Sequence, residues 1–341
     1  MHRGTAITRR VGCAVLLAAA LILTACGPEL GPVSRVTGIG APRLPETSDP
    51  SILREGRTFH VYGSDNHVRA PVMVTTDVSR VYTLAEKNDL LDNAMPNKAP
   101  WAVNPNQHWA PTVAKFNSTY VMFFSTDRAS GYVFNNRQCI GRATSSSPRG
   151  PFVAGASPVQ CGLNWTGGAL DPEIFRDPRT GRWYLLAAFG NTHENIKVMP
   201  LDGNGNISGA PTTILARQHP WECGLDRANC FIENPAMVYD PVRNSYLLAY
   251  SAGQWSTGGY VTGLARCASP AGPCTSNPAG PWISSSNGRS GPGGLSWFTN
   301  AAGTTHAIFS THRAGQEGGT GGRSASIMRL VLTPSVTLAD R

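Results

Sequence analysis

Short apolar runs separated by turn-forming residues make up most of the chain. The clearest unit begins at Asp171-Pro172-Glu173-Ile174, a strand-like run with proline near its start, where a missing backbone donor is tolerated. A turn at residues 177–181 and a continuous apolar run at residues 183–189 follow, and such a run is typical of a fully buried returning strand. Residues 233–251 repeat the same order, so the pattern predicts pairs of antiparallel strands.

The same unit recurs at a nearly fixed interval. Matching segments begin, 60 to 62 residues apart, at Asp49-Pro50-Ser51, Trp109-Ala110-Pro111, Asp171-Pro172-Glu173 and Glu233-Asn234-Pro235, and one further step reaches Leu295-Ser296-Trp297. Five similar units therefore fill residues 49 to about 330. A repeat of this size predicts a radial all-β architecture, in which equivalent residues of different units face one axis.

Composition agrees with one large β-rich domain. The chain has 341 residues, 41% of them apolar, with 37 Gly and 26 Pro, and no amphipathic helical pattern persists beyond the N-terminus. The formal charge of +8 falls to +5 without the three arginines of the N-terminal leader, and the remaining basic residues are not clustered as a nucleic-acid surface requires. We therefore expect no nucleic-acid partner, and a monomer.

The N-terminus predicts export. Three arginines precede an apolar stretch at residues 11–23, which is too short to span a membrane comfortably but suits a signal peptide over residues 1–26. It ends in Leu23-Thr24-Ala25-Cys26, which resembles a bacterial lipobox, so Cys26 is expected to carry lipid and anchor the protein outside the cytoplasm. An ordinary secretory signal with an incidental Cys26 is the alternative. Residues 27–46, rich in Gly and Pro, predict a flexible tether, and residues 47–341 the folded domain.

Export changes how the other cysteines are interpreted. An even number of cysteines outside the cytoplasm favours disulfides, and six cysteines allow 15 connectivities. A zinc site is the alternative, but no CxxC spacing or clustered histidine supports it. The simplest pairing joins neighbours in the sequence, as loop staples: Cys139–Cys161, Cys223–Cys230 and Cys267–Cys274.

Three of the repeated segments carry a carboxylate at the same point of the pattern: Asp49, Asp171 and Glu233. Acids that converge on one axis predict chemistry or a metal site. For any single acid, a turn or strand cap is the better interpretation, because Asp-Pro is common at turns; the matched register of three favours a site. Other acids fall off the matched position or in turns and are assigned no chemistry: Glu173, Asp177 and Asp240.

The chain resembles glycoside hydrolase family 43 over essentially its whole mature length. The resemblance rests on the four segments that begin with an acid or tryptophan and on blade endings of the type Ser-Pro-x-Gly-Pro at residues 147–151 and 269–273. The resemblance implies a five-bladed β-propeller and inverting hydrolysis of furanosides or xylosides at the centre of the ring.

Carried over residue by residue, the resemblance implies that Asp49 is the general base, Glu233 the general acid, and Asp171 the acid that tunes the pKa of Glu233 and orients it. An inverting hydrolase needs an ionised carboxylate to activate water and a protonated one to protonate the leaving oxygen, about 6.5–9.5 Å apart. A third carboxylate nearby raises the pKa of the proton donor by like-charge repulsion.

Other residues are candidates for substrate binding. Trp109 holds the matched position in a unit without an acid, where an indole can stack on a sugar or serve as a core aromatic. Asp65 and Asn66 follow a strand of the first unit, where a polar rim loop can touch sugar hydroxyls or simply face solvent.

The last unit departs from the family. Many members carry a histidine ligand of a central metal within Gly-Pro-Gly-His, but here the stretch reads Gly291-Pro292-Gly293-Gly294. His306 and His312 lie nearby in sequence, and a lone histidine is more often structural. We therefore expect no cofactor and no required metal.

The leading hypothesis is a lipid-anchored glycosidase that cuts pentofuranose linkages of polysaccharides or oligosaccharides, such as α-L-arabinofuranosides, with xylosides close behind. Bacterial arabinogalactan, including its galactofuranose, is another candidate substrate. A sugar-binding lipoprotein without turnover is the alternative from a different class, and a retaining enzyme, with carboxyl groups about 5–5.5 Å apart, is the third.

Overall fold

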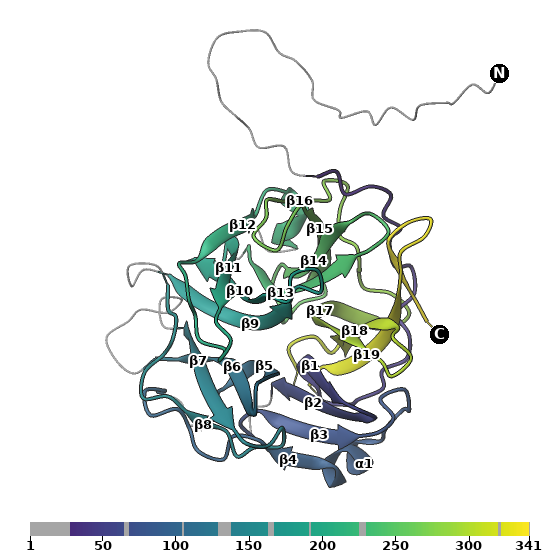
Figure 1. The fold of residues 1–341 in the computed structure, drawn as a ribbon. Helices are drawn as coiled ribbons and strands as arrows, with labels where there is room; N and C mark the ends of the chain where they lie inside the picture. The colour runs from purple at the N-terminus through teal and green to yellow at the C-terminus, as the bar shows by residue number, and fades with distance from the viewer. Residues whose placement is uncertain are drawn as a thin grey trace, which may run out of the picture.

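The computed structural model describes residues 28–64, 68–103, 106–128, 138–162, 167–190, 192–224, 230–319 and 322–340. These residues form five four-stranded antiparallel sheets, each built from strands that are consecutive in sequence. The first strands of neighbouring sheets pack against one another around a closed ring, β1 against β5 and finally β17 against β1 (Figure 1). The predicted all-β, five-bladed β-propeller is confirmed.

The strand bounds show how regular the blades are. The first blade holds β1 (Ser48–Glu55), β2 (Thr58–Ser64), β3 (Pro71–Thr75) and β4 (Leu91–Asn93); the second β5 (Trp109–Phe116), β6 (Thr119–Asp127), β7 (Gln138–Ser145) and β8 (Val153–Ala154); the third β9 (Gly168–Arg176), β10 (Trp183–Gly190), β11 (Asn195–Leu201) and β12 (Thr212–Ala216); the fourth β13 (Ile232–Asp240), β14 (Ser245–Ala252), β15 (Val261–Cys267) and β16 (Cys274–Ser276); the fifth β17 (Arg289–Thr299), β18 (Thr305–Arg313), β19 (Ser324–Val331) and β20 (Thr337–Ala339).

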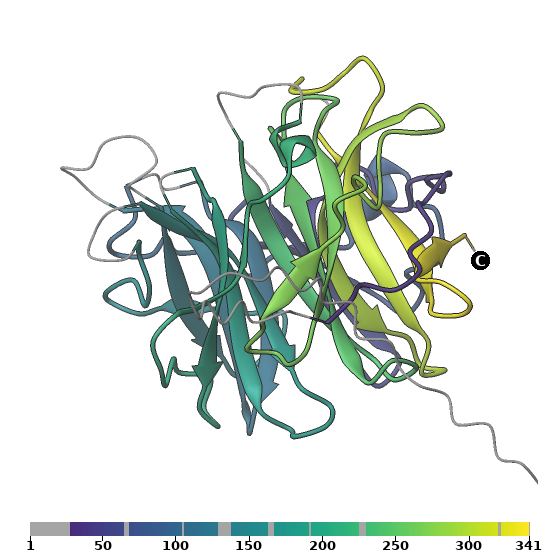
Figure 2. The same cartoon turned by 90° about the horizontal axis from the view of Figure 1, so that it is seen from above.

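The hydrophobic core lies between the blades. Five clusters of buried side chains fill the five interfaces between neighbouring sheets. Figure 2 shows the sheets standing next to one another. A second strand such as β14 is therefore covered on both faces and buried along its whole length. This explains why the returning strands read as continuous apolar runs instead of alternating ones.

The described part of the predicted tether, residues 28–46, differs from that expectation. It lies along the outside of the last two blades (Figure 1), with backbone bridges from Val33 to Val336, Val36 to Ile283 and Leu44 to Ala325. The side chains of Val36 and Leu44 are buried, Leu44 in the cluster between the fifth and first blades. Apolar residues spaced among the glycines and prolines let this segment bury surface, which a free linker does not do.

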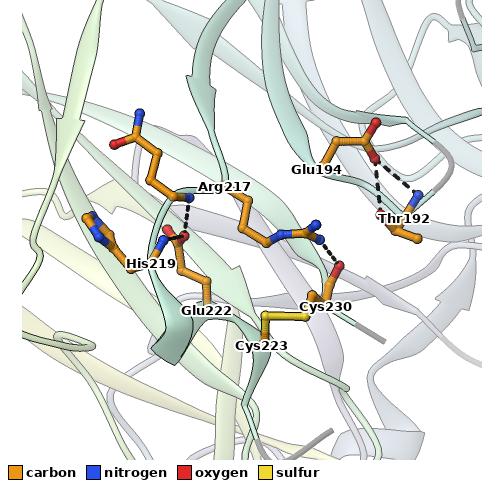
Figure 3. Close-up of a disulfide and its surroundings, with 8 residues drawn as sticks. Thr192, Glu194, Arg217, His219, Glu222, Cys223 and Cys230 are labelled. Carbon is orange, nitrogen blue, oxygen red and sulfur yellow. Dashed lines mark hydrogen bonds between the residues drawn. A yellow bond between two sulfur atoms is a disulfide. The ribbon is translucent and has the colours of Figure 1, made fainter. Parts of the chain in front are cut away.

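Three disulfides join the six cysteines in the predicted pairs, Cys139–Cys161, Cys223–Cys230 and Cys267–Cys274. They are not all loop staples, because Cys267 and Cys274 face each other across β15 and β16. The bond between Cys223 and Cys230 links a short 3-10 helix, η2 (Pro220–Cys223), to the chain that enters β13, and the Arg217 side chain donates to the Cys230 carbonyl beside it (Figure 3).

One α-helix, α1 (Leu84–Asp89), lies between β3 and β4 and is capped by Thr83, which accepts a hydrogen bond from the Glu86 amide. Within the described ranges no helix has the length and apolar character needed to cross a membrane. The predicted signal peptide and Cys26 lie outside the described residues.

Candidate active site

A bulge interrupts the first strand of every sheet, and β17 has two. The matching bulge contains proline in the first four blades and Gly294-Leu295 in the fifth. The residue before the proline, or before Leu295 in the last blade, has left-handed backbone geometry. The five residues and their φ angles are Asp49 (42°), Ala110 (46°), Asp171 (53°), Asn234 (45°) and Gly294 (61°). Such geometry is uncommon outside glycine, and bulges of this kind re-aim a side chain beside functional sites.

The shared register of the three acids was wrong by one residue. Asp49 and Asp171 occupy the left-handed position, but Glu233 comes one residue earlier, in the register of Trp109, and Asn234 holds the left-handed place. All three acids nevertheless line one cavity of about 710 Å³. The bulge brings side chains from both positions to the same hollow.

Serines from neighbouring blades hold three of these bulges. In each case a serine near the end of a second strand accepts a hydrogen bond from the backbone amide at the left-handed position of the next blade. The pairs are Ser64 with Ala110 at 2.8 Å, Ser125 with Asp171 at 2.8 Å, and Ser251 with Gly294 at 2.9 Å. An aromatic residue one or two places before each serine, as in Phe124-Ser125, was a sequence signal that could have identified this contact.

Asp49 is held by two side-chain donors. The Ser64 hydroxyl donates to its Oδ2 atom at 2.8 Å, and the Nη1 atom of Arg323 donates to its Oδ1 atom at 3.1 Å. Arg323 is itself buried. It directly precedes β19 and lies near the other end of the chain from Asp49. A charge-assisted pair of this kind fixes the orientation of the carboxylate.

Glu233 lies in a drier environment. Burial raises the pKa of its carboxyl group to about 7, with the negative charge of Asp49 adding to the rise, while the Tyr260 hydroxyl and the Arg323 guanidinium oppose it. The Tyr260 oxygen lies 2.8 Å from Oε1 of Glu233 and 2.8 Å from Oδ1 of Asn234. Tyr260 has one hydrogen for these two acceptors, so it donates to one of them at a time.

Asp171 is buried and lines the same cavity as the other two acids. Its pKa is raised well above the ordinary range, first by burial and then by the charges of Glu233 and Asp49. The Asn234 amide donates to its Oδ2 atom at 3.3 Å. The rise in the pKa of Glu233 was expected from repulsion by Asp171, but burial is the larger cause and Asp49 supplies the charge.

The structure places one predicted binding residue at the cavity. Trp109 lines it, at the start of β5, whereas Asp65 and Asn66 lie outside the described residues. Sequence reasoning missed Arg323 and Tyr260. Arg323 is 274 residues from Asp49 and Tyr260 is 27 from Glu233, and no spacing pattern in a single chain marks such contacts.

The acids without assigned chemistry fall into two groups. Asp177 and Asp240 serve the turns, where Asp177 accepts from the Tyr246 hydroxyl and Asp240 pairs with Arg266. Glu173 instead lines a small second cavity of about 20 Å³ on the axis, next to Asp49 and Asp171. Ser296 donates to Glu173 at 2.8 Å, and burial raises the pKa of Glu173 to about 7.

The central metal of the family does not fit these residues. Gly294 stands where the family histidine is expected, and a Cβ atom there would lie 2.7 Å from Oδ1 of Asp49. His312 lines the large cavity and bonds to the Trp255 carbonyl, while His306 stacks on Phe298 away from the axial cavity. In the described part of the chain, no three His, Cys, Asp or Glu residues gather as a metal site.

Treatment with a strong chelator should therefore leave the activity of the purified protein unchanged. The physical reason is that the Arg323 guanidinium and the Ser64 hydroxyl already hold Asp49 in place. Initial rates before and after dialysis against the chelator check this. A large loss that added divalent cation restores would contradict it.

A five-bladed propeller with three acids lining one cavity near its axis defines a propeller of the glycosidase type. The family model for glycosyl hydrolases family 43 matches residues 42–336, and the chain belongs to that family.

The chain also resembles individual members. It is 25% identical over 248 residues to the extracellular endo-alpha-(1->5)-L-arabinanase 2 of Bacillus subtilis (strain 168), a match that covers 66% of this chain and 49% of that protein. The chain thus matches about half the length of that relative. Its fold superposes on a thermostable family-43 glycoside hydrolase with a TM-score of 0.72 at 22% identity, covering 92% of this chain and 96% of the other. An alpha-L-arabinofuranosidase from Lactobacillus brevis gives a TM-score of 0.72 at 14% identity, with 88% and 95% covered.

Proposed function

We propose that this protein is an inverting glycoside hydrolase of arabinose- or xylose-containing polysaccharides and oligosaccharides, with α-L-arabinofuranosyl linkages as the first candidate. The observation that carries the proposal is the contrast between two acids in one cavity. Asp49 is tied to a guanidinium, whereas burial raises the pKa of Glu233 to about 7. One carboxylate suited to activating water and one suited to remaining protonated are what inversion requires.

The roles follow from these environments. Asp49 is the general base that removes a proton from the attacking water, and Glu233 is the general acid that protonates the leaving oxygen. Asp171, which accepts from the Asn234 amide beside Glu233, orients the acid segment, and the repulsion between Asp171 and Glu233 disfavours the ionisation of both at once. Trp109 is the wall on which a sugar ring can pack.

Substrate identity is tested with a panel of arabinan, xylan and bacterial arabinogalactan, followed by product analysis. Release of arabinose or arabino-oligosaccharides supports the first candidate, and release of xylose or galactofuranose selects an alternative. Proton NMR of the first product anomer separates inversion from retention. If sugars bind but no member of the panel is cut, the protein is a sugar-binding lipoprotein.

We also propose that the protein acts outside the cytoplasm, as a monomer anchored through a lipid on Cys26. The three disulfides support an oxidising location. Because residues 28–46 are packed against the ring, the anchor would hold the propeller close to the membrane surface. Mass spectrometry of the mature N-terminus tests the lipid.

Trp255 should favour longer substrates. Its side chain is 50% exposed and lines the same cavity as the acids, and His312 donates to its carbonyl at 3.2 Å. Aromatic contacts of this kind contribute about 1 kcal/mol, so Trp255→Ala should raise KM for oligosaccharides roughly fivefold. Aryl monoglycosides, which are too short to reach the rim, should be unaffected, and Trp255→Phe should keep most of the preference. Equal losses on both substrates would contradict this assignment.

A further inference from the structure

His193 lies beside Glu233 in an unusual backbone conformation. It sits between β10 and β11 with a φ of 45°, and its carbonyl accepts a hydrogen bond from the Ile232 amide at 2.9 Å. Only 5% of its surface is exposed. Left-handed geometry at a non-glycine residue costs on the order of 1 kcal/mol and persists where neighbouring structure fixes it. The turn that carries His193 is thus tied to the residue directly before Glu233.

The hydrogen bonds of His193 define its tautomer. Its Nε2 atom lies 2.9 Å from Oε1 of Gln138, the first residue of β7. An amide oxygen only accepts, so Nε2 carries the hydrogen and Nδ1 keeps its lone pair. Burial lowers the pKa of His193 to about 4, so the ring is neutral near pH 7. Gln138 is paired with Asp127 across β6 and β7 and directly precedes Cys139, which is bonded to Cys161.

The free lone pair faces the acid. Nδ1 of His193 is buried without a hydrogen-bond partner and lies 3.7 Å from Oε2 of Glu233, while Oε1 of Glu233 lies beside Tyr260. At 3.7 Å the contact is not yet a hydrogen bond, but catalytic contacts are often long before substrate binds. A small rotation of the Glu233 carboxyl group would close it.

We propose that His193 is a positioning residue for Glu233: its neutral Nδ1 atom accepts the Oε2 hydrogen of the protonated acid and holds that proton until the glycosidic oxygen takes its place. The inference rests on the proposed function. The proton remains on Glu233 in the free enzyme and moves to the leaving oxygen during the reaction, which leaves Glu233 ionised.

Other groups around the pair act in known directions. Asp49 faces Glu233 from β1 and favours its protonated form, and Glu233 in turn raises the pKa of Asp171 on β9, whereas Arg323 and the Tyr260 hydroxyl favour the ionised form of Glu233. The neighbouring Glu194 raises the pKa of His193, but the opposite effect of burial is larger. Within the described residues none of these groups offers Oε2 an acceptor, whereas Nδ1 of His193 does.

The test compares two substitutions at one position. His193→Phe keeps a buried ring and removes the acceptor, whereas His193→Asn keeps an oxygen near the Nδ1 place and suits a positive φ. A hydrogen bond to the protonated form raises the pKa, so His193→Phe should move the alkaline limb of the kcat/KM profile about one pH unit lower. At pH 8, kcat/KM should fall roughly tenfold, since the protonated fraction of the acid falls tenfold for each pH unit above its pKa. His193→Asn should keep the wild-type limb, and the acid limb should not move in either variant.

A second measurement keeps the test independent of turnover. The carboxyl carbon of Glu233 is followed by NMR in protein labelled at glutamate, with the signal identified by its absence in Glu233→Gln. The titration midpoint of Glu233 should fall in His193→Phe and in Gln138→Met. The second substitution removes the acceptor that keeps the hydrogen of His193 on Nε2, and it leaves the strained turn unchanged. If the midpoint is the same in wild type and both variants, or falls equally in His193→Asn, the inference is wrong. If no glycoside is cut but the midpoint shifts as expected, only the proposed function fails.

Discussion

Replacing Glu233 with glutamine should lower kcat/KM on natural glycosides by about 10²- to 10⁴-fold, the usual contribution of a general acid. The amide has the size of the carboxyl group and can accept from Tyr260 as Oε1 does, so the cavity keeps its shape. It has no acidic proton for the leaving oxygen. A dinitrophenyl leaving group needs no proton, so aryl glycosides of this type should retain most of their turnover.

The matched control for this substitution is Glu173→Gln. Glu173 is also a buried glutamate with a pKa raised to about 7 by burial, but it lines the small axial cavity and not the large one. Its substitution should leave the leaving-group dependence of the rate unchanged. Equal losses on natural and dinitrophenyl glycosides in Glu233→Gln, or the same selective loss in Glu173→Gln, would remove Glu233 from the role of acid.

The blade repeat was predictable because it is local. Each unit buries its returning strand between two sheets, so apolar runs, turns and proline recur at the blade interval. Proline was also the better register marker. Aligned on Pro50, Pro111, Pro172 and Pro235, the chain puts Asp49 and Asp171 one residue before proline and Glu233 two residues before it. This is the register that the bulges of the structure have.

The parts that could not be predicted depend on long-range contacts. Arg323 reaches Asp49 only because the fifth blade closes the ring against the first, and Tyr260, directly before β15, reaches Glu233 of β13 only because the strands of the fourth blade fold back on one another. The prediction of a flexible tether was wrong for a related reason. Its glycines and prolines are typical of a linker, but whether Leu44 finds a buried site depends on the edge of the last blade, which local composition does not describe.

Asp49→Asn should cause a loss of kcat that a better leaving group cannot offset. Water still needs to lose a proton as it attacks, so kcat should fall by about 10²- to 10⁴-fold on natural and dinitrophenyl substrates alike. The asparagine oxygen can still accept from Arg323 or Ser64, so the cavity should survive. Asp177→Asn is the control, because Asp177 is also followed by proline but accepts from the Tyr246 hydroxyl in a turn. Its substitution should lower the thermal midpoint without changing kcat.

Azide makes the Asp49 substitution diagnostic. Azide attacks without losing a proton, so it should restore turnover of dinitrophenyl glycosides by Asp49→Asn and give a glycosyl azide of inverted configuration. That product places Asp49 on the face opposite the leaving group, which suits a base or a nucleophile. The wild-type product then decides between them, because only a base gives inverted sugar, whereas a nucleophile gives retained sugar through a covalent intermediate. Full activity in Asp49→Asn, or a retained wild-type anomer, would contradict the base assignment.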